Sequence, residues 1–541
     1  MRGLVRARWV VGAAVLALVA TACGSSGEEG GGSGGTQGGG AFSFYIGEPE
    51  HLIPGNTNES NGGEVLDALY TGLINYDPQT SQPVYNGIAE ENGITSDDQK
   101  TWTIKLKKGW TFHNGEPVTA QSFVDAWNFT AYAPNANGNS YFFENVQGFD
   151  DLQTEKEGEE PKAEKMSGLE AVNDHTLKVT LKAPFSQFPL SLGYTAFYPM
   201  AKACLDDLKA CEEKPIGSGP FKMDGTWQHN QAINVTKFAD YAGAAPKSDA
   251  VEFRIYTDVN TAYNDLLAGS LDVMDTLPPE KVNDAKAKMA DRFIERESSN
   301  FTYIGFPLYD DRFKNADLRR AFSMAIDRQS IVDQIFNGAY TPAKSVVSPV
   351  VAGSRANPCG DSCEYDPEGA KKLLEKAGGF DGRLELWFNA GSGHDQWMQA
   401  VANNLRQNLG IKSVVFKQKQ FAEYLADLDA DKATGPFRLG WIMDYPSPQN
   451  YLEPIYGTGG SSNASEYSNA QVDQLIEKGN SAPTIEAGIE YYNQAEDLIL
   501  QDMPVIPMFH QKVQAAYSDN VDNVVIDAFT STDIENITVN R

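Results

Sequence analysis

Residues 437–446 read Phe-Arg-Leu-Gly-Trp-Ile-Met-Asp-Tyr-Pro, and this stretch decides which class of fold the chain can have. Its short apolar centre lies between Gly435-Pro436 and Pro446, which is typical of a strand buried on both faces. Asp444 stands where this strand should end. Because open α/β sheets bind ligands outside the carboxyl ends of their strands, Asp444 is a candidate partner for a cationic group. The alternative is an aspartate that only bonds to a nearby loop.

Other parts of the chain show the same alternation of strands and helices. Strands are expected at 41–46, 251–255 and 271–274, with a helix at 261–267 between the last two. A strand–helix–strand order of this kind predicts a parallel sheet, and therefore the α/β class. The polar, acidic segment 135–165 is expected to be a surface loop.

Length and charge limit the possible functions. With 541 residues, 41% of them hydrophobic, the chain is long enough for two or three domains with sizeable cores. Its formal charge of −29 predicts repulsion from nucleic acid and from anionic membrane surfaces, so we expect no nucleic-acid partner. The excess of carboxylates either attracts cationic ligands or only keeps the surface solvated.

The amino terminus is predicted to be an export signal and not part of the fold. Arg2, Arg6 and Arg8 precede an apolar run at 9–20 that is too short to be a comfortable membrane anchor. This order indicates a signal peptide over residues 1–22.

Cys23 follows the signal at a position that suggests attachment to a membrane. The small residues before it resemble a bacterial lipoprotein signal, which implies that Cys23 is lipidated, although such signals prefer Leu where Ala20 stands. A plain signal peptide with a chance cysteine is the alternative. Residues 23–40 are rich in Gly and Ser and predict a flexible tether with an r.m.s. span of about 23 Å. We therefore expect a protein anchored to the outer face of the cell membrane.

Four further cysteines are expected to form disulfides, because their number is even and the chain is predicted to be exported. The economical pairing is local, with Cys204 joined to Cys211 and Cys359 joined to Cys363. A zinc site is the weaker alternative, since the chain has no Cys-x-x-Cys and no histidine close to these cysteines.

Residues 103–123 carry a longer signature. An alternating strand runs into Gly-Trp-Thr-Phe-His-Asn-Gly-Glu-Pro, whose Asn114-Gly115 pair favours a tight hairpin turn, and Thr119 is a plausible N-cap for the following helix. This block resembles the signature of the family 5 periplasmic solute-binding proteins, the peptide, dipeptide and nickel receptors of ATP-binding-cassette importers. Blocks that resemble other parts of this family follow in family order, at 215–221, 313–328, 366–378 and 503–509.

The resemblance implies an α/β, two-lobed fold of the periplasmic-binding-protein type II, with an extra α/β subdomain inserted in the first lobe. It implies closure of the lobes on a ligand, a permease and an ATPase as partners, and a monomeric chain. The expected domains are the first lobe at 41–88, 211–300 and 504–541, the inserted subdomain at 89–210, and the second lobe at 301–503.

The spacing of Arg438 and Asp444 predicts how a peptide would be held. The two residues lie six positions apart, so they could face the same side of a strand and span about 20 Å, or three to five extended residues. A peptide offers backbone groups that pair as an added strand, and termini that opposite charges can hold. The resemblance implies that Asp444 binds the peptide α-ammonium and that Arg438 helps to receive the carboxylate.

The resemblance also implies secondary contacts. The backbone around Gly440, Trp441 and Ile442 would pair with the peptide, and His394 would contact the carboxyl ends of longer peptides; as alternatives, Trp441 is a core residue and His394 an exposed loop residue. A loop containing Glu48 and Glu50 aligns loosely with one that donates backbone hydrogen bonds, although Pro49 lacks one such donor. Two further departures are Ser447, where many members have Asp, and Gln420, where the family is often aromatic.

Other functions are less well supported by the sequence. We find no Gly-x-Ser-x-Gly nucleophile elbow, since the match at residues 31–35 is part of the Gly-rich tether, and we find no His-Glu-x-x-His and no P-loop. The six histidines are scattered, so we expect neither an enzyme nor a cofactor or metal site. A receptor of the same fold for nickel, a metallophore or another small solute is the closer rival, and a surface adhesion or signalling lipoprotein is a third reading. The pairing of Asp444 with Arg438 favours a zwitterionic peptide.

Overall fold

The computed structural model describes residues 39–154, 159–390 and 393–540. The predicted signal peptide, the tether and the predicted lipidation site Cys23 lie outside the described residues.

An 11-stranded mixed sheet runs through the described chain, in the order β15-β14-β16-β12-β17-β11-β1-β10-β9-β8, with β13 also paired to β17. Its strands are β1 (Ala41–Ile46), β8 (Phe221–Met223), β9 (Ala232–Lys237), β10 (Ala250–Ile255), β11 (Val273–Met274), β12 (Phe293–Gly305), β13 (Tyr340–Pro342), β14 (Arg383–Asn389), β15 (Ser413–Lys419), β16 (Phe437–Trp441) and β17 (Val505–Tyr517).

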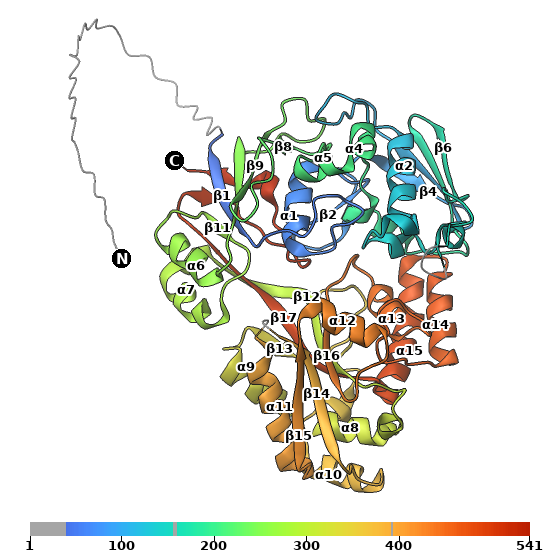
Figure 1. Cartoon of the computed structure of the whole chain (residues 1–541), viewed down its shortest axis with the longest axis vertical. Coiled ribbons are helices and arrows are strands. Elements are labelled where there is room, and N and C mark those ends of the chain that lie inside the picture. Colours follow the sequence, from blue (N-terminus) through green and yellow to red (C-terminus); the bar gives the residue numbers. More distant parts are fainter. Residues whose placement is uncertain (1–38, 155–158, 391–392, 541) are drawn as a thin grey trace, which may run out of the picture. The chain divides into compact units, whose positions relative to one another are not determined.

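The long antiparallel strands β12 and β17 join the two halves of this sheet (Figure 1). In the second half, Phe301–Gly305 of β12 pair with β16. In the first half, Ala516 and Tyr517 of β17 pair with β11. We call the part around β1 and β8–β11 the first half and the part around β14–β16 the second half. Since the sheet has no break between them, the lobe boundaries expected from the sequence remain predictions.

In the first half, β1 is parallel to β10 and β11, as the strand–helix–strand pattern predicted. Alternate side chains of β1 enter different cores: Phe42 and Phe44 pack with α1 (Ser60–Leu69), whereas Tyr45 packs with α6 (Val259–Leu267) and α7 (Val282–Met289). Because successive side chains of a strand point to opposite faces, both faces of this half are covered.

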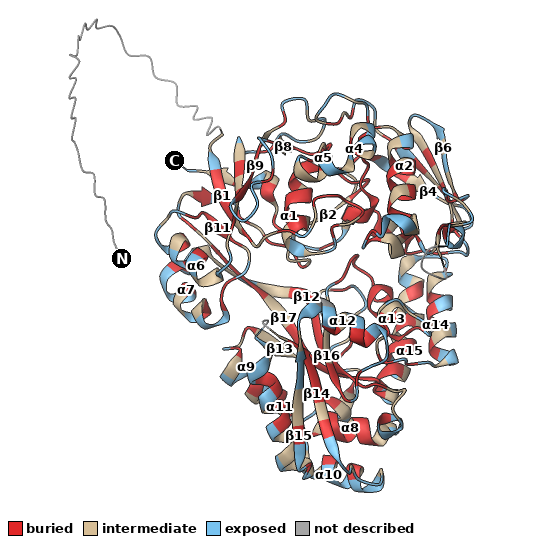
Figure 2. Cartoon of the chain, in the orientation of Figure 1, coloured by how far each residue is buried: buried red, intermediate tan, exposed pale blue. Residues whose placement is uncertain are grey.

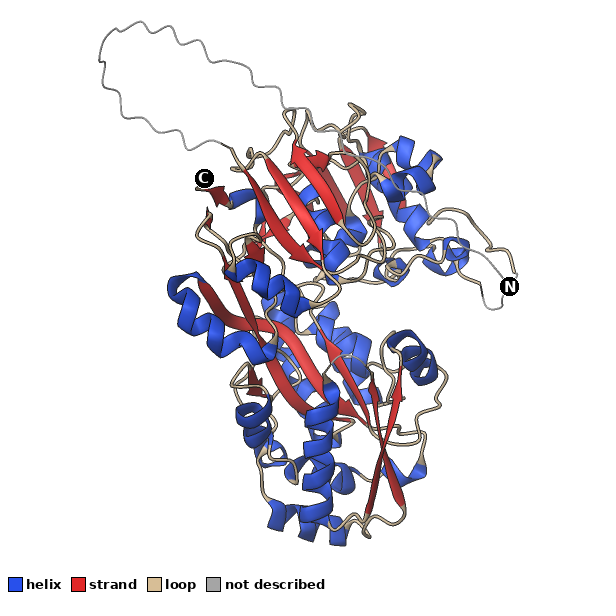
Figure 3. Cartoon of the chain, turned by 60° about the vertical axis from the view of Figure 1, so that its left-hand side comes forward, coloured by secondary structure: helices blue, strands red, loops and turns tan. Residues whose placement is uncertain are grey.

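The second half is covered on both faces in the same way (Figures 2 and 3). On β12, Tyr303 packs into one core and Ile304 into the opposite one. The helices on the first side are α12 (Phe421–Asp429), α13 (Gln449–Tyr456), α14 (Ala470–Asn480) and α15 (Ile485–Asp502). Those on the second side are α8 (Ala316–Met324), α9 (Arg328–Ile335), α10 (Pro367–Lys376) and α11 (His394–Leu409).

A separate four-stranded antiparallel sheet, ordered β4-β5-β7-β6, lies within 89–210. It comprises β4 (Ala89–Thr95), β5 (Thr101–Leu106), β6 (Leu169–Asn173) and β7 (Thr176–Thr180), and α2 (Ala120–Ala131) packs on it. Thr119 is the N-cap of α2, as predicted, and forms a capping box with Ser122. The remaining regular elements are β2 (Asn75–Tyr76), β3 (Pro83–Val84), α3 (Phe188–Ser191), α4 (Lys202–Asp206), α5 (Leu208–Glu213), β18 (Val521–Asp522) and β19 (Thr538–Val539).

The expectation of a surface loop at 135–165 is wrong in its first part. Short 3₁₀ helices occur there, and Phe143 and Leu152 are fully buried. Phe143 packs against Trp127 of α2 with ring centroids 5.7 Å apart. The surface loop was predicted because the segment is acidic. The aromatic residues between the acids, however, complete the core of the small sheet.

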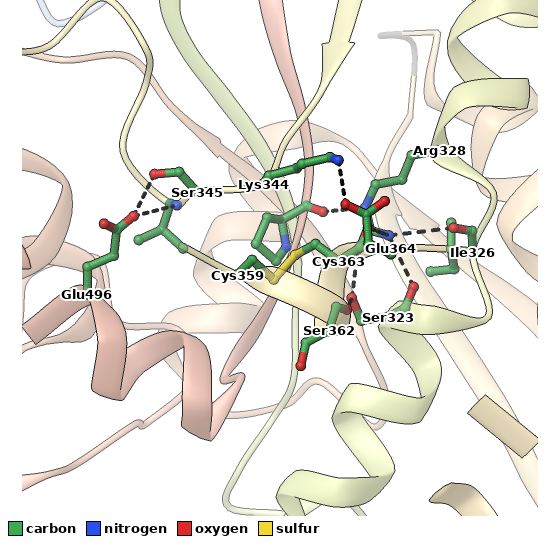
Figure 4. The surroundings of a disulfide bond; sticks show 12 residues. Ser323, Ile326, Arg328, Lys344, Ser345, Cys359, Ser362, Cys363, Glu364 and Glu496 are labelled. Carbon is green, nitrogen blue, oxygen red and sulfur yellow. Dashed lines mark hydrogen bonds and ion pairs between the residues drawn. A yellow bond between two sulfur atoms is a disulfide. The ribbon is translucent and has the colours of Figure 1, made fainter. Parts of the chain in front are cut away.

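Both disulfides have the expected local pairing. Cys204 joins Cys211 with Cα atoms 5.0 Å apart, and Cys359 joins Cys363 with Cα atoms 5.7 Å apart. Figure 4 shows the second bridge beside the Lys344–Glu364 ion pair. Each bridge closes a short local loop, so neither disulfide joins the two halves to each other.

Candidate ligand-binding cavity

A cavity of about 850 Å³ is lined by both halves of the chain. The first half and the small sheet contribute residues from 57–86, 141–198 and 527–536, and the second half contributes Asn300, Phe421 and 438–444. This volume lies in the usual range for ligand sites. Five of the residues predicted to bind ligand meet here, namely Arg438, Gly440, Trp441, Ile442 and Asp444.

The strand that was predicted to end at Asp444 stops at Trp441. Phe437 is buried, but the other residues of β16 are only half-buried, so the prediction of a strand buried on both faces is wrong. The reason is that this face of β16 borders the cavity. The even spacing of Arg438 and Asp444 therefore no longer fixes their separation, because the chain leaves strand geometry between them.

Beyond its first residue, β16 has one free edge. Its whole length pairs with β12, whereas β14 meets it only at Phe437 opposite Trp387. No other described strand pairs with the edge of residues 438–441, where Tyr424 Oη donates to the Arg438 carbonyl at 2.7 Å. The neighbouring Ile442 keeps 38% of its surface exposed. An unpaired edge at a cavity is the arrangement to which an extended peptide adds as a strand.

Asp444 is a buried carboxylate without a cationic partner among the described residues. It is only 9% exposed, and Asn450 Nδ2 donates to its Oδ2 at 2.8 Å. Asn450 Oδ1 in turn accepts from the Asp444 backbone N–H at 2.8 Å and from Trp441 Nε1 at 3.2 Å, which fixes this turn. Burial raises the pKa of Asp444 to about 7, and the Asn450 hydrogen bond opposes this shift. An ammonium group delivered by a ligand would restore the missing countercharge.

Aromatic side chains from the other side of the cavity approach Asp444. Burial raises the pKa values of Tyr76, Tyr141 and Tyr194, and the negative charge of Asp444 adds to each shift. Tyr76 also stacks on Phe529 with ring centroids 4.7 Å apart. The carboxylate thus lies in an apolar, aromatic setting in which a charge–charge contact with a ligand is strengthened.

Arg438 carries the only cationic side chain among the described residues that line the cavity. Its Nη1 donates to Asn389 Oδ1 at 3.4 Å, and its buried Nε has no hydrogen-bond partner among the described residues. Burial lowers the pKa of Arg438, and the neighbouring hydroxyls of Tyr424, Tyr340 and Tyr303 oppose this shift. A guanidinium with an unused donor can receive a carboxylate.

His394, Glu48 and Glu50 do not line the cavity. His394 begins α11, accepts from Trp397 Nε1 at 3.2 Å, and has its pKa lowered to about 3 by burial and by the charge of Arg438. Glu48 bonds to His229 Nδ1 at 2.8 Å, and Glu50 is exposed. The structure therefore leaves His394 near Arg438 but turns Glu48 towards a different neighbour, and the ligand roles of all three stay predictions.

The sequence reasoning missed the opposite wall of the cavity. Glu64 and Asp67 lie on α1, and Asp527 lies in the carboxyl-terminal segment. The sequence offers no local motif at these two acids, which lie three residues apart on one helix. No pattern in the sequence linked them to Asp527.

Within the described part of the chain, no group of three or more His, Cys, Asp or Glu side chains is spaced to hold a metal ion. None of its helices is long and apolar enough to cross a bilayer.

Residues 83–463 match the family described as bacterial extracellular solute-binding proteins, family 5 Middle. The chain belongs to this family, whose members are solute-binding proteins and not enzymes.

Relatives cover nearly the whole chain. The oligopeptide-binding protein OppA of Bacillus subtilis is 27% identical over 95% of both chains, and the dipeptide-binding protein DppE of the same organism is 26% identical over 80% of both. The glutathione-binding protein GsiB of Escherichia coli is 26% identical over 87% of this chain and 88% of its own.

Solved structures share the fold. The Escherichia coli murein tripeptide binding protein MppA superposes with a TM-score of 0.78 at 22% identity, covering 92% of this chain and 98% of its own. The Haemophilus influenzae OppA complex with the peptide RPPGFSPFR gives 0.76 at 21% identity, covering 93% and 99%. The predicted α/β fold of the type II periplasmic binding proteins is thereby confirmed.

Proposed function

We propose that this protein captures peptides in the cavity and delivers them to an ATP-binding-cassette importer. The observation that carries the proposal is Asp444, a buried carboxylate at the cavity wall with no cation to pair with among the described residues. The relatives named for oligopeptide, dipeptide and glutathione binding support the same ligand class.

In this proposal the peptide is held mainly through groups that every peptide has. Its α-ammonium pairs with Asp444, its backbone adds to the free edge of β16 at Gly440 and Trp441, and its carboxylate is received by Arg438. Main-chain pairing tolerates different side chains, whereas the charged ends fix direction. Since β16 stops at Trp441, the spacing in the sequence no longer sets the length of the peptide.

Capture involves movement of the two halves about β12 and β17. These strands are the continuous connection of the sheet, so bending them would open or close the cavity without breaking either core. The closed form would be recognised by the permease and ATPase subunits. Lipidation at Cys23 would keep the monomeric receptor on the outer face of the membrane.

The test uses the purified, exported chain and one peptide in two forms. Calorimetry with a free tetrapeptide and with its N-acetylated form should show at least tenfold weaker binding after acetylation, because the acetyl group removes the ammonium that Asp444 requires. Mass spectrometry of ligand released from denatured protein should identify peptides. Equal affinities for both forms, or release of a metal chelate or another small solute, would contradict the proposal and favour the rival receptor of the same fold.

A further inference from the structure

The cavity is unusually acidic for a site that binds a zwitterion. Of its lining residues, eight are Asp or Glu and one, Arg438, is a cation. Two of these acids have local structural roles: Glu59 caps α1, and Asp77 accepts from the N–H groups of Gln79 and Thr80. One ammonium and one carboxylate on the ligand would leave the remaining negative charge uncompensated.

Three of the acids gather on the wall opposite β16, and we call Glu64, Asp67 and Asp527 the inner acidic cluster. Asp67 accepts from Tyr198 Oη at 2.9 Å and from Ser531 Oγ at 2.7 Å. Asp527 accepts from the backbone N–H groups of Phe529 and Ser531 at 2.8 and 2.9 Å. Each of these donors is neutral, so hydrogen bonding orients the carboxylates without neutralising them.

Glu64 is the member with unused capacity. It is 3% exposed, and its Oε1 accepts from the Thr532 N–H at 3.0 Å. Its Oε2 is buried and has no hydrogen-bond partner among the described residues. A buried acceptor without a donor is costly, and a ligand that brings a donor relieves that cost. Glu64 is one of the residues that line the cavity.

The surrounding charges point the same way. Burial and the charges of Asp275, Asp67 and Asp527 raise the pKa of Glu64 well above its usual value, and burial raises that of Asp527 to about 7. The charge of Arg296 partly opposes the shift of the Asp527 pKa, but this guanidinium donates to the backbone oxygens of Pro78, Gln79 and Ile526, forms no ion pair with the cluster among the described residues, and does not line the cavity. The cluster thus lacks a resident counterion among the described residues.

The cluster lies within reach of a ligand held at Asp444. After burial, the charges of Asp444 and Asp67 both raise the pKa of Tyr194, and the charges of Asp444 and Asp527 act together on Tyr76. Both tyrosines line the cavity, and each lies close enough to Asp444 and to one member of the cluster to feel both charges. Their rings offer an apolar path for an alkyl chain and a favourable face for a cation.

Resting on the proposed function, we propose that the inner acidic cluster is a side-chain subsite for a lysine or arginine of the bound peptide. The preferred ligands are then cationic peptides, which carry one positive group to Asp444 and a second to Glu64, Asp67 and Asp527. The three carboxylates are not spaced to hold a bare metal ion, whereas a flexible ammonium or a forked guanidinium can bond to oxygens at several positions.

The experiment compares lysine with norleucine, which has a similar alkyl chain and no charge, at each position of a tetra-alanine peptide. Calorimetry with the wild-type chain at pH 7.5 should show, at one position, at least tenfold tighter binding of the lysine peptide. The ratio of the affinity for the lysine peptide to that for the norleucine peptide should fall at least fivefold in E64Q and in D527N. E64Q keeps an Oε1 acceptor for Thr532. The control E375Q removes an exposed charge on α10 and should keep the wild-type ratio.

The outcomes separate the two proposals. If peptides bind but lysine and norleucine are equal at every position, the acidic subsite is wrong and peptide capture stands. If the ratio is unchanged in both E64Q and D527N, the preference comes from elsewhere and the assignment to this cluster is wrong. If no peptide binds the wild-type chain at all, both proposals are wrong.

Discussion

The two walls of the cavity differ in what they offer a ligand. The wall from the second half presents the free edge of β16 with one acid, Asp444, and one base, Arg438. The wall from the first half presents the inner acidic cluster and tyrosines. In our proposals, the first wall binds features common to all peptides, and the second distinguishes their side chains. Affinity and selectivity can therefore be separated experimentally by mutating one wall at a time.

The largest expected effect comes from removing the anion of the β16 wall. We expect D444A to weaken the binding of free peptides at least tenfold, since truncating one partner of a buried charge pair costs about 2–5 kcal/mol. The ligand-free variant should keep its melting temperature, because Asp444 has no cationic partner to lose among the described residues. Calorimetry and thermal denaturation measure the two quantities, with exposed Asp519→Ala as the matched control. A loss of affinity as large with the N-acetylated peptide would contradict the role of Asp444.

The pH dependence of binding should be nearly as large. A carboxyl with a pKa of about 7 must lose its proton before it can pair with an ammonium, so the affinity of the wild-type chain should fall about tenfold between pH 7 and pH 5.5, a range in which the peptide α-ammonium stays protonated. Calorimetry at the two pH values in D444N, which cannot titrate at this position, should show a much flatter profile. An equally steep fall in D444N would assign the titration to another group, such as Asp527.

A smaller effect is expected from the cation of the same wall. R438Q should weaken the binding of peptides with a free carboxyl end about fivefold, because the carboxylate loses a charged donor. Peptides with an amidated end should bind the variant and the wild-type chain equally. If R438Q weakens both forms to the same degree, Arg438 stabilises the site in another way and does not receive the carboxylate.

The smallest effect concerns the ligand-free protein. In Asp444 the folded-state pKa is raised, so between about pH 4 and pH 7 the folded chain binds more protons than the unfolded one, and stability falls as the pH rises through this window. This group alone should stabilise the protein at pH 6 relative to pH 8 by about 1 kcal/mol, or about 1 °C in melting temperature for a chain of this length. The pH 6 to pH 8 difference should shrink by this amount in D444N, and an unchanged difference would exclude a raised pKa.

Much of the β16 wall was predictable from the sequence because the residues that form it are close together in the sequence. Arg438, Gly440, Trp441, Ile442 and Asp444 occupy one short stretch that resembles a family block, and all five line the cavity. The limits of the strand were not predictable. An apolar stretch has the same sequence pattern whether its second face packs against a core or borders a cavity. Only the packing around β16 in the structure showed that this strand is half-buried.

The opposite wall could not be predicted because its information is spread over the chain. Glu64 and Asp527 are far apart in sequence, and each looks like a solvated acid on its own. They come together because the carboxyl-terminal segment packs against α1, where Thr532 donates to Glu64 and Ser531 to Asp67. Glu48 bonds to His229 and does not line the cavity, and its ligand role stays a prediction.

By itself, the sequence determined the α/β class, the local disulfides and Asp444 as the residue to examine first, because hydrophobic periodicity, cysteine spacing and a short motif all act over a few neighbouring residues. The tertiary structure alone decided which acids face one another across the cavity and which strand edge stays unpaired. These properties depend on contacts between distant segments, and burial gives the carboxylates their raised pKa values and their demand for a cation.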